Sequence, residues 1–262
     1  MSNQKESTAR TLTVALLVCL VCSVFVAGAA VALRPTQEAN RQLDKQRSIL
    51  SIAGLGEAGM SARQVRDLYA QRITARVVDL ETGTFTDELD PTSFDPLAAA
   101  KDPQLSKALP GQQDIASIKR RERYTTVYLV ESEGELQTLV LPVRGYGLWS
   151  TLYGFIAVEG DLNTVAGFGF YQHGETPGLG GEVDNPKWKS LWLGKSLFDE
   201  NGKLAVQIVK GNVDAQSPKA IHQVDGLAGA TLTSNGVNNL LHFWLGENGF
   251  GSFIAKLRAG EA

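Results

Sequence analysis

The hydrophobic pattern of the chain begins with a long apolar run. Residues 11–33 contain no charged side chain. As an α-helix this run is about 34 Å long at 1.5 Å per residue, which exceeds the roughly 30 Å hydrocarbon core of a bilayer. The pattern predicts one membrane-spanning helix over residues 11–33, after a short tail over residues 1–10. A cleaved signal peptide with Ala27-Gly28-Ala29 as its cleavage site is the alternative, but such apolar regions normally span only about 7 to 15 residues.

Residues 34–110 are predicted to form a helical and connecting region. The charged stretch at 37–50 indicates a helix that continues away from the membrane, and a glycine-rich break follows at 54–59. Ser61 is expected to cap a second helix. Residues 82–110 are rich in Asp, Pro and Ala, which is typical of a connection and leaves room for one short helix.

The second half of the chain changes to a period of two. Its β-branched and aromatic runs are separated in two places by turn-forming residues, at 133–135 and 160–163. Short strands joined by tight turns indicate an antiparallel meander. The predicted strands cover residues 124–130, 136–143, 153–159 and 164–171, with a further strand at 204–209.

The clearest helical periodicity lies near the C-terminus. Ser234 is expected to cap this helix, and Gly249 and Gly251 lie just past its end. The sequence therefore predicts an α+β fold, an antiparallel sheet with packed helices over residues 111–262, preceded by one N-terminal transmembrane helix. The apolar positions that recur at i, i+3, i+4, i+7 and i+8 are Val237, Leu240, Leu241, Trp244 and Leu245.

Charge and cysteine content narrow the chemistry. The net charge of −3, from 25 basic and 28 acidic residues, argues against a nucleic-acid partner. Cys19 and Cys22 both lie in the apolar run, so the rest of the chain has no disulfide and no thiolate metal site. We expect no metal site and no catalytic residue.

Residues 225–234, DGLAGATLTS, combine three features just before the last helix. Gly and Ala residues allow a close approach of the backbone to a bulky group, Thr231, Thr233 and Ser234 offer hydroxyls, and a helix N-terminus favours a phosphate. The stretch is neither a P-loop nor a dinucleotide fingerprint. By itself it is equally typical of a loop that enters a capped helix.

A second motif, YQHGETPGLGG at residues 171–181, follows the last meander strand. Its Thr-Pro-Gly fits a tight turn with Pro at i+1 and Gly at i+2, and a glycine-dense loop with a leucine at its tip suits an aromatic ring system. A third stretch, GYGLWS at 145–150, is also rich in glycine and aromatics. Taken alone, each is also typical of an ordinary surface turn or of core aromatics.

Together the three motifs resemble those of the FMN-binding domain family. Residues 225–231 are similar to its flavinylation motif, Asp-Gly-x-Ser/Thr-Gly-Ala-Thr, except that Ala228 stands where Ser or Thr is usual. The resemblance implies that Thr231 carries FMN through a phosphoester, with Thr233 as the second choice. Residues 173–180 resemble the second signature, and residues 145–150 the segment beside the flavin.

The resemblance also implies roles for the residues around the cofactor. Glu175 and Thr176 are expected near the ring, Leu179 on its face, and Tyr146 and Trp149 as walls of the pocket. The remaining cofactor-binding candidates are Asp225, Gly229, Ala230, His173, Gly180 and Leu148.

Within this family, the single N-terminal helix and the length resemble the C subunits of bacterial Na+-translocating NADH:quinone reductases. The G subunits of the related ferredoxin:NAD electron-transport complex are the alternative. The resemblance implies an electron-transfer subunit with covalent FMN in a complex that couples electron flow from NADH to ubiquinone with sodium export. It further implies other membrane subunits as partners, a flavin transferase during maturation, and a single-pass protein of the bacterial inner membrane with a periplasmic domain.

Two expectations about this chain's own part follow from its residues. No dinucleotide fingerprint is present, so we expect no NADH site here. One helix without an ionisable residue cannot line a sodium pathway by itself. The basic residues on both sides of the helix give no clear orientation.

Two other classes of function remain open from the residues. One is a membrane-anchored scaffold without cofactor, in which the glycine motifs are only turns. The other is a hydrolase with Ser150 or Thr231 as nucleophile and His173 or His222 as base, although no Ser-x-x-Lys or Gly-x-Ser-x-Gly arrangement supports it.

Overall fold

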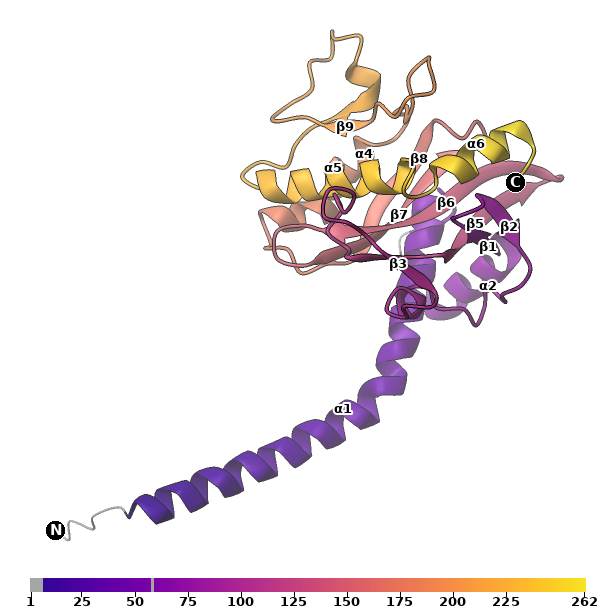
Figure 1. The fold of residues 1–262 in the computed structure, drawn as a ribbon. Helices are drawn as coiled ribbons and strands as arrows, with labels where there is room; N and C mark the ends of the chain where they lie inside the picture. The colour runs from indigo at the N-terminus through magenta and orange to yellow at the C-terminus, as the bar shows by residue number, and fades with distance from the viewer. Residues whose placement is uncertain (1–6, 58) are drawn as a thin grey trace. The chain divides into compact units, whose positions relative to one another are not determined.

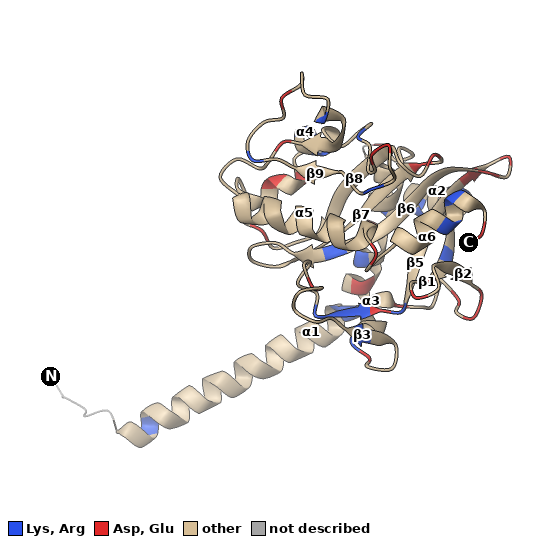
Figure 2. Cartoon of the chain, turned by 45° about the horizontal axis from the view of Figure 1, so that its top comes forward, with Lys and Arg blue, Asp and Glu red and all other residues tan. Residues whose placement is uncertain are grey.

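The computed structural model describes residues 7–57 and 59–262, which divide into two compact units, Met1–Asp44 and Lys45–Ala262 (Figure 1). The first unit consists of most of helix α1 (Thr8–Ile52). Among the described residues, α1 is the helix long and apolar enough to cross a membrane. Residues 11–33 of this helix contain no charged side chain, and the corresponding part of α1 is tan in Figure 2.

The helix expected at residues 37–50 is not a separate element. It continues the apolar helix without a break, and Pro35 lies inside α1. Proline lacks a backbone N–H and therefore removes one i→i−4 hydrogen bond. The neighbouring turns keep their backbone hydrogen bonds, so the helix continues past Pro35 to Ile52.

The second unit is built on one six-stranded antiparallel sheet with the order β2-β1-β5-β6-β7-β8. The predicted meander is confirmed as its last four strands, and the turn at Glu133 and Gly134 has positive φ at both residues, as a tight hairpin requires. The strands are β1 (Thr74–Asp79), β2 (Thr84–Thr86), β5 (Tyr124–Ser132), β6 (Glu135–Tyr146), β7 (Thr151–Glu159) and β8 (Val165–Gln172).

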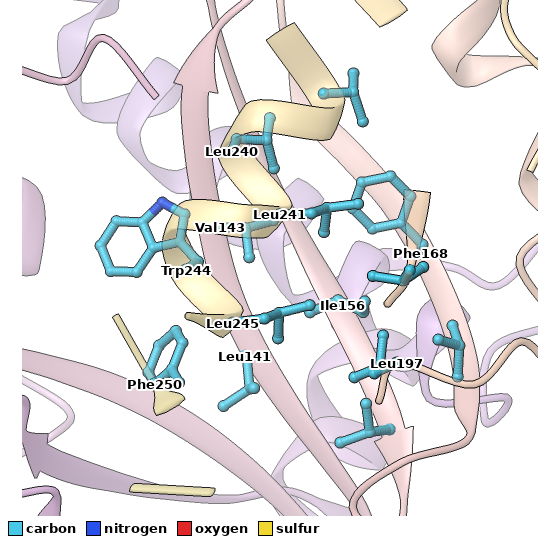
Figure 3. Close-up of a cluster of buried hydrophobic side chains, with 14 of the residues drawn as sticks. Leu141, Val143, Ile156, Phe168, Leu197, Leu240, Leu241, Trp244, Leu245 and Phe250 are labelled. Carbon is cyan, nitrogen blue, oxygen red and sulfur yellow. The ribbon is translucent and has the colours of Figure 1, made fainter. Parts of the chain in front are cut away.

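One face of this sheet is covered by the two C-terminal helices, α5 (Thr231–Leu245) and α6 (Gly251–Ala259). The helix predicted from the period at 237–245 is therefore confirmed, and its apolar side packs on the middle strands. Figure 3 shows the core between them, which includes Leu141, Val143, Ile156, Phe168, Leu240, Leu241, Trp244 and Leu245.

The other face is covered by the end of α1 and by α2 (Ala62–Arg72). Tyr69 of α2 meets Tyr128 of β5 edge-on at 6.4 Å. A Cβ on Gly167 of β8 would lie 2.2 Å from the carbonyl oxygen of Ile52, so α1 and β8 are in close contact. Because both faces are covered, β5 is buried along most of its length, which explains the four consecutive apolar residues at 127–130.

Ser61 caps α2 as predicted. Its hydroxyl accepts from the N–H of Gln64, whose side chain accepts in turn from the N–H of Ser61. This reciprocal pair satisfies two N–H groups at the start of the helix.

The connecting region contains more regular structure than the sequence indicates. The short helix expected within residues 82–110 is present as α3 (Pro96–Ala99), but β2 and β3 (Ser106–Ala108) were not predicted. The strand expected at 204–209 is reduced to β9 (Gln207–Ile208), which pairs in parallel with β10 (Gln223–Val224) outside the main sheet. The remaining elements are β4 (Arg120–Glu122), η1 (Gly180–Asp184), α4 (Pro186–Ser190) and η2 (Ala220–His222).

Candidate cofactor site

The three motifs meet at the carboxylate of Glu175. This residue follows β8 and accepts hydrogen bonds from the backbone N–H groups of Leu148 (3.1 Å), Trp149 (3.0 Å) and Ser150 (3.3 Å). It also accepts from the hydroxyl of Thr233 in the first turn of α5, at 2.7 Å. One buried side chain therefore joins the β6–β7 turn, the loop after β8 and the start of α5.

Hydrogen bonding keeps this carboxyl ionised despite its burial. Burial by itself raises the pKa of Glu175, but the bonds from Trp149, Thr233, Leu148 and Ser150 together outweigh that effect and hold the pKa below its ordinary value. The site is therefore assembled around a fixed negative charge.

Thr231 is the first residue of α5, and its side chain is exposed. Gly229, at φ +72°, turns the chain into the helix, and the N-cap Ala230 provides no side-chain hydrogen bond. The N–H groups of the first turn are thus not capped by a side chain, and together with the helix dipole they favour an anion.

The prediction that Ser234 caps this helix is wrong. Its N–H already bonds to the carbonyl of Ala230 inside the helix, and its hydroxyl accepts from the N–H of Leu227 at 3.0 Å. The N-cap is Ala230, so the helix starts four residues earlier than the sequence suggested, because Gly229 supplies the turn. Ser234 instead holds the preceding loop against the first turn.

The hydroxyl of Thr233 is directed into the protein. The residue is fully buried, and a Cβ on Gly180 would lie only 2.5 Å from its hydroxyl oxygen. Gly180 is thus needed for close packing against Thr233. Of the three hydroxyls in the motif, Thr231 alone is exposed, since Ser234 is buried as well.

The loop after β8 is held by its own polar groups. The turn predicted at Thr176-Pro177-Gly178 is confirmed, with Gly178 at φ +75° and a hydrogen bond from the N–H of Leu179 to the carbonyl of Thr176. His173 contacts Asp184 at 2.7 Å through Nε2, and its Nδ1 accepts from the N–H of Glu175. His173 therefore fixes the loop that carries Glu175.

Five exposed apolar side chains come from the segments that Glu175 joins. We call them the apolar collar. Leu179 of the collar lies against Gly229, where an added Cβ would be 3.2 Å from its methyl group. Large exposed apolar side chains from the three segments that Glu175 joins, one of them directly after Thr231 in the chain, suit a flat aromatic ligand. The collar consists of Tyr146, Leu148, Trp149, Leu179 and Leu232.

Asp225 is turned toward a different neighbour. Its carboxylate accepts from the N–H of Val213 at 2.8 Å, and its carbonyl accepts from the indole N–H of Trp188 at 2.9 Å. These two hydrogen bonds of Asp225 hold the loop that leads to Thr231 in place. It also borders a hollow of about 390 Å³, which Leu191 and Ile221 line from the other side.

Comparisons with known proteins identify the family of the chain. The family model of the FMN-binding domain matches residues 147–246, which include Glu175 and Thr231. The C subunit of the Na(+)-translocating NADH-quinone reductase of Pseudomonas aeruginosa is 76% identical over 262 residues, 100% of both chains. The C subunit of the Yersinia pestis reductase is 51% identical, over 97% of this chain and 95% of that one. The chain belongs to the family of Na+-translocating NADH-quinone reductase C subunits.

Solved structures from this family show the same fold. NqrC of Shewanella oneidensis is 40% identical, with a TM-score of 0.76 over 84% of this chain and 99% of that one. The C subunit of the Parabacteroides distasonis reductase is 27% identical, with a TM-score of 0.63 over 86% of this chain and 96% of that one. The alternative of a G subunit is not favoured, because all of these relatives are C subunits.

As a C subunit, the chain is one part of a multi-subunit oxidoreductase, and the other subunits are its partners. The contacts of its described residues do not assemble a hydrolase site. Ser150 accepts from the N–H of Gly174, whereas the rings of His173 and His222 bond to Asp184 and to the carbonyl of Ser196. Neither imidazole therefore has a hydroxyl as its hydrogen-bond partner, which a catalytic base acting on a Ser or Thr nucleophile needs.

Two residues of the C-subunit site were missed by the sequence analysis. Asp184 holds His173, and nothing in the sequence around it indicates that contact. Gly236 lets α5 approach the turn after β6, where an added Cβ would lie 2.5 Å from the carbonyl oxygen of Tyr146. A glycine inside a strongly periodic helix was the signal available for this close approach.

Proposed function

We propose that this protein holds FMN covalently through a phosphoester on Thr231 and relays electrons between its neighbours in the reductase. The exposure of Thr231 carries the proposal. The other two hydroxyls of the motif are buried, and that of Thr233 is already donated to Glu175. A modifying enzyme therefore meets only one accessible acceptor in this motif.

The surroundings of Thr231 suit both the phosphate and the ring system of FMN. The uncapped first turn of α5 favours a phosphate, and the apolar collar offers its side chains to a ring system. Bound FMN would supply one- and two-electron transfer. In this arrangement Leu179 and Trp149 pack against the ring, Thr176 lies at the exposed turn of the adjoining loop, and Glu175 and His173 keep that loop in place.

Attachment requires an external enzyme. Threonine is a weak nucleophile without an adjacent base, and the imidazoles of His173 and His222 are engaged elsewhere. We therefore propose that a flavin transferase installs FMN from FAD: the Thr231 oxygen forms a bond to the FMN phosphorus, the pyrophosphate bond of FAD breaks, and AMP and the hydroxyl proton leave. This step takes place on the folded surface, since Thr231 is exposed at the beginning of a helix.

The apolar part of α1 is proposed to anchor the protein in the bacterial inner membrane, with Lys45–Ala262 in the periplasm. A reporter fused to the C-terminus, active only after export, tests this orientation. Reporter activity is expected. Activity of a cytoplasm-specific reporter at the same position would contradict the periplasmic placement.

The attachment is tested by expressing the chain with its transferase and examining the denatured protein. A fluorescent band on an SDS gel and a mass increase of one FMN are expected for the parent. Thr231→Ala is expected to remove both, because the only exposed hydroxyl of the motif is gone. Thr233→Ala retains the acceptor and should keep the label, which peptide mapping would locate on Thr231.

The cofactor-free scaffold predicts a different result. A dark band with an unmodified mass in the parent, despite active transferase, would support the scaffold and contradict covalent FMN. A label that survives Thr231→Ala and is lost in Thr233→Ala would move the acceptor to the buried position.

A further inference from the structure

Among the buried carboxylates of the described residues, Glu175 differs from Glu122 and Asp79 in having no ion-pair partner. Glu122 is paired with Arg144, and Asp79 with Arg123. Within the part of the chain that the structure describes, Glu175 has no ion pair, and all its hydrogen-bond donors are uncharged N–H and O–H groups. Its negative charge is stabilised by dipoles but not neutralised.

This charge lies at the centre of the candidate cofactor site. Two of its donors, Leu148 and Trp149, belong to the apolar collar, and a third, Thr233, is two residues after the acceptor Thr231. Only 5% of Glu175 is exposed, so little water screens the field that it exerts on its neighbours. A ligand on the collar would therefore experience a fixed negative charge.

We propose that the Glu175 carboxylate sets the redox potential of this protein, by making electron addition to FMN on Thr231 less favourable. This inference rests on the proposed function. Reduction places extra negative charge on the flavin, and a nearby like charge in a poorly solvated site opposes it. Glu175 thereby holds the midpoint potential of the flavin low, in addition to joining the three segments.

The test is a spectroelectrochemical titration of the flavinylated full chain. Glu175→Gln removes the charge and keeps the length of the side chain. The midpoint potential is expected to rise by the equivalent of a tenfold or larger change in the equilibrium constant for reduction, about 30 mV for a two-electron couple. Glu175→Asp keeps the charge and is expected to stay nearer the parent's potential.

Asp161, an exposed carboxylate, offers a control at a distance from the candidate cofactor site. Its carboxylate is also held by uncharged donors, the N–H groups of Asn163 and Thr164 at 2.8 Å and the hydroxyl of Thr164 at 2.5 Å. Asp161 lies in the turn after β7. The backbone N–H groups that bind Glu175 lie in the turn before β7. A nine-residue strand separates them by roughly 30 Å. Asp161→Asn is therefore expected to leave the potential unchanged.

Three outcomes would overturn the proposal. In the first, Glu175→Gln has the parent's potential. In the second, Glu175→Asp shifts the potential as far as Glu175→Gln does, which would assign the effect to geometry. In the third, Glu175→Gln folds but takes up no flavin, so that the residue only shapes the site. A parent chain without covalent flavin would instead contradict the proposed function itself.

Discussion

At the scale of single residues, two buried threonines show how differently the same side chain is used. Thr233 donates its hydroxyl to the ionised carboxylate of Glu175. Thr125, in the middle strand β5, is equally buried, yet within the described chain its hydroxyl has no hydrogen-bond partner. A hydrogen bond to a charged group contributes about 1.5–3 kcal/mol, whereas a buried hydroxyl without a partner costs stability.

Replacing each threonine by the isosteric valine is expected to change the free energy of unfolding differently at the two positions. Thr233→Val should lower the free energy of unfolding by about 1.5–3 kcal/mol, because Glu175 loses a donor while still charged. Thr125→Val should leave it unchanged or raise it slightly, since no hydrogen bond is lost. Urea unfolding of the detergent-solubilised chain measures both, and equal destabilisation by the two substitutions would contradict the assigned bond.

At the scale of elements, the contacts of its first two turns determine the position of helix α5. Residue 236 on its buried side is glycine, and the carbonyl of Tyr146 and the Cα of Gly147 occupy the space that a side chain would need, at 2.5 and 2.9 Å from an added Cβ. The helix thus approaches the β6–β7 turn backbone to backbone. That approach brings Thr233 within reach of Glu175.

Gly236→Ala is therefore expected to destabilise the protein even though alanine favours a helix. The gain in helix propensity is about 1 kcal/mol, but overpacking against backbone atoms costs about 1–3 kcal/mol, and the shifted turn should also reduce FMN incorporation. Asn235→Ala, at the adjacent exposed position, is the control and should keep or slightly raise stability. Melting temperature and flavin content report the two effects, and a more stable, fully loaded Gly236→Ala protein would refute the close approach.

At the scale of the whole second unit, one buried ion pair connects distant parts of the chain. Arg144 of β6 donates to both carboxylate oxygens of Glu122 of β4, at 2.6 and 2.5 Å. The indole N–H of Trp244 in α5 donates to the carbonyl of Arg144 at 2.7 Å. The pair thus lies where the central sheet, helix α5 and the small β3–β4 sheet meet.

Glu122→Ala is expected to lower the free energy of unfolding by about 3–5 kcal/mol, because it leaves the guanidinium of Arg144 buried without its partner. The matched control is Asp87→Ala at an exposed pair with Arg76, which is 3.9 Å long. Exposed pairs contribute about 0–1 kcal/mol. Urea denaturation measures both, and a Glu122→Ala effect as small as that of the control would show that the pair is not buried as described.

Much of this fold could be predicted from the sequence because the relevant forces are local. An uncharged run long enough to span a bilayer, the turn residues Glu133 and Gly134, and the capping Ser61 all act within a few residues of where they stand. The missed strands β1 and β2 had no such local signal. β2 pairs with β1, and β1 pairs in turn with the distant strand β5, in a register that joins Val77 to Thr126.

By itself, the sequence determined the long apolar helix, the meander, helix α5 and the three motifs, because periodicity and turn chemistry are properties of neighbouring residues. Only the tertiary structure decided which of the three hydroxyls in residues 225–234 is exposed. It also decided that Glu175 is the shared partner of Leu148, 27 positions before it, and Thr233, 58 positions after it. Such contacts depend on how β6, β8 and α5 pack together, and no stretch of sequence contains that information locally.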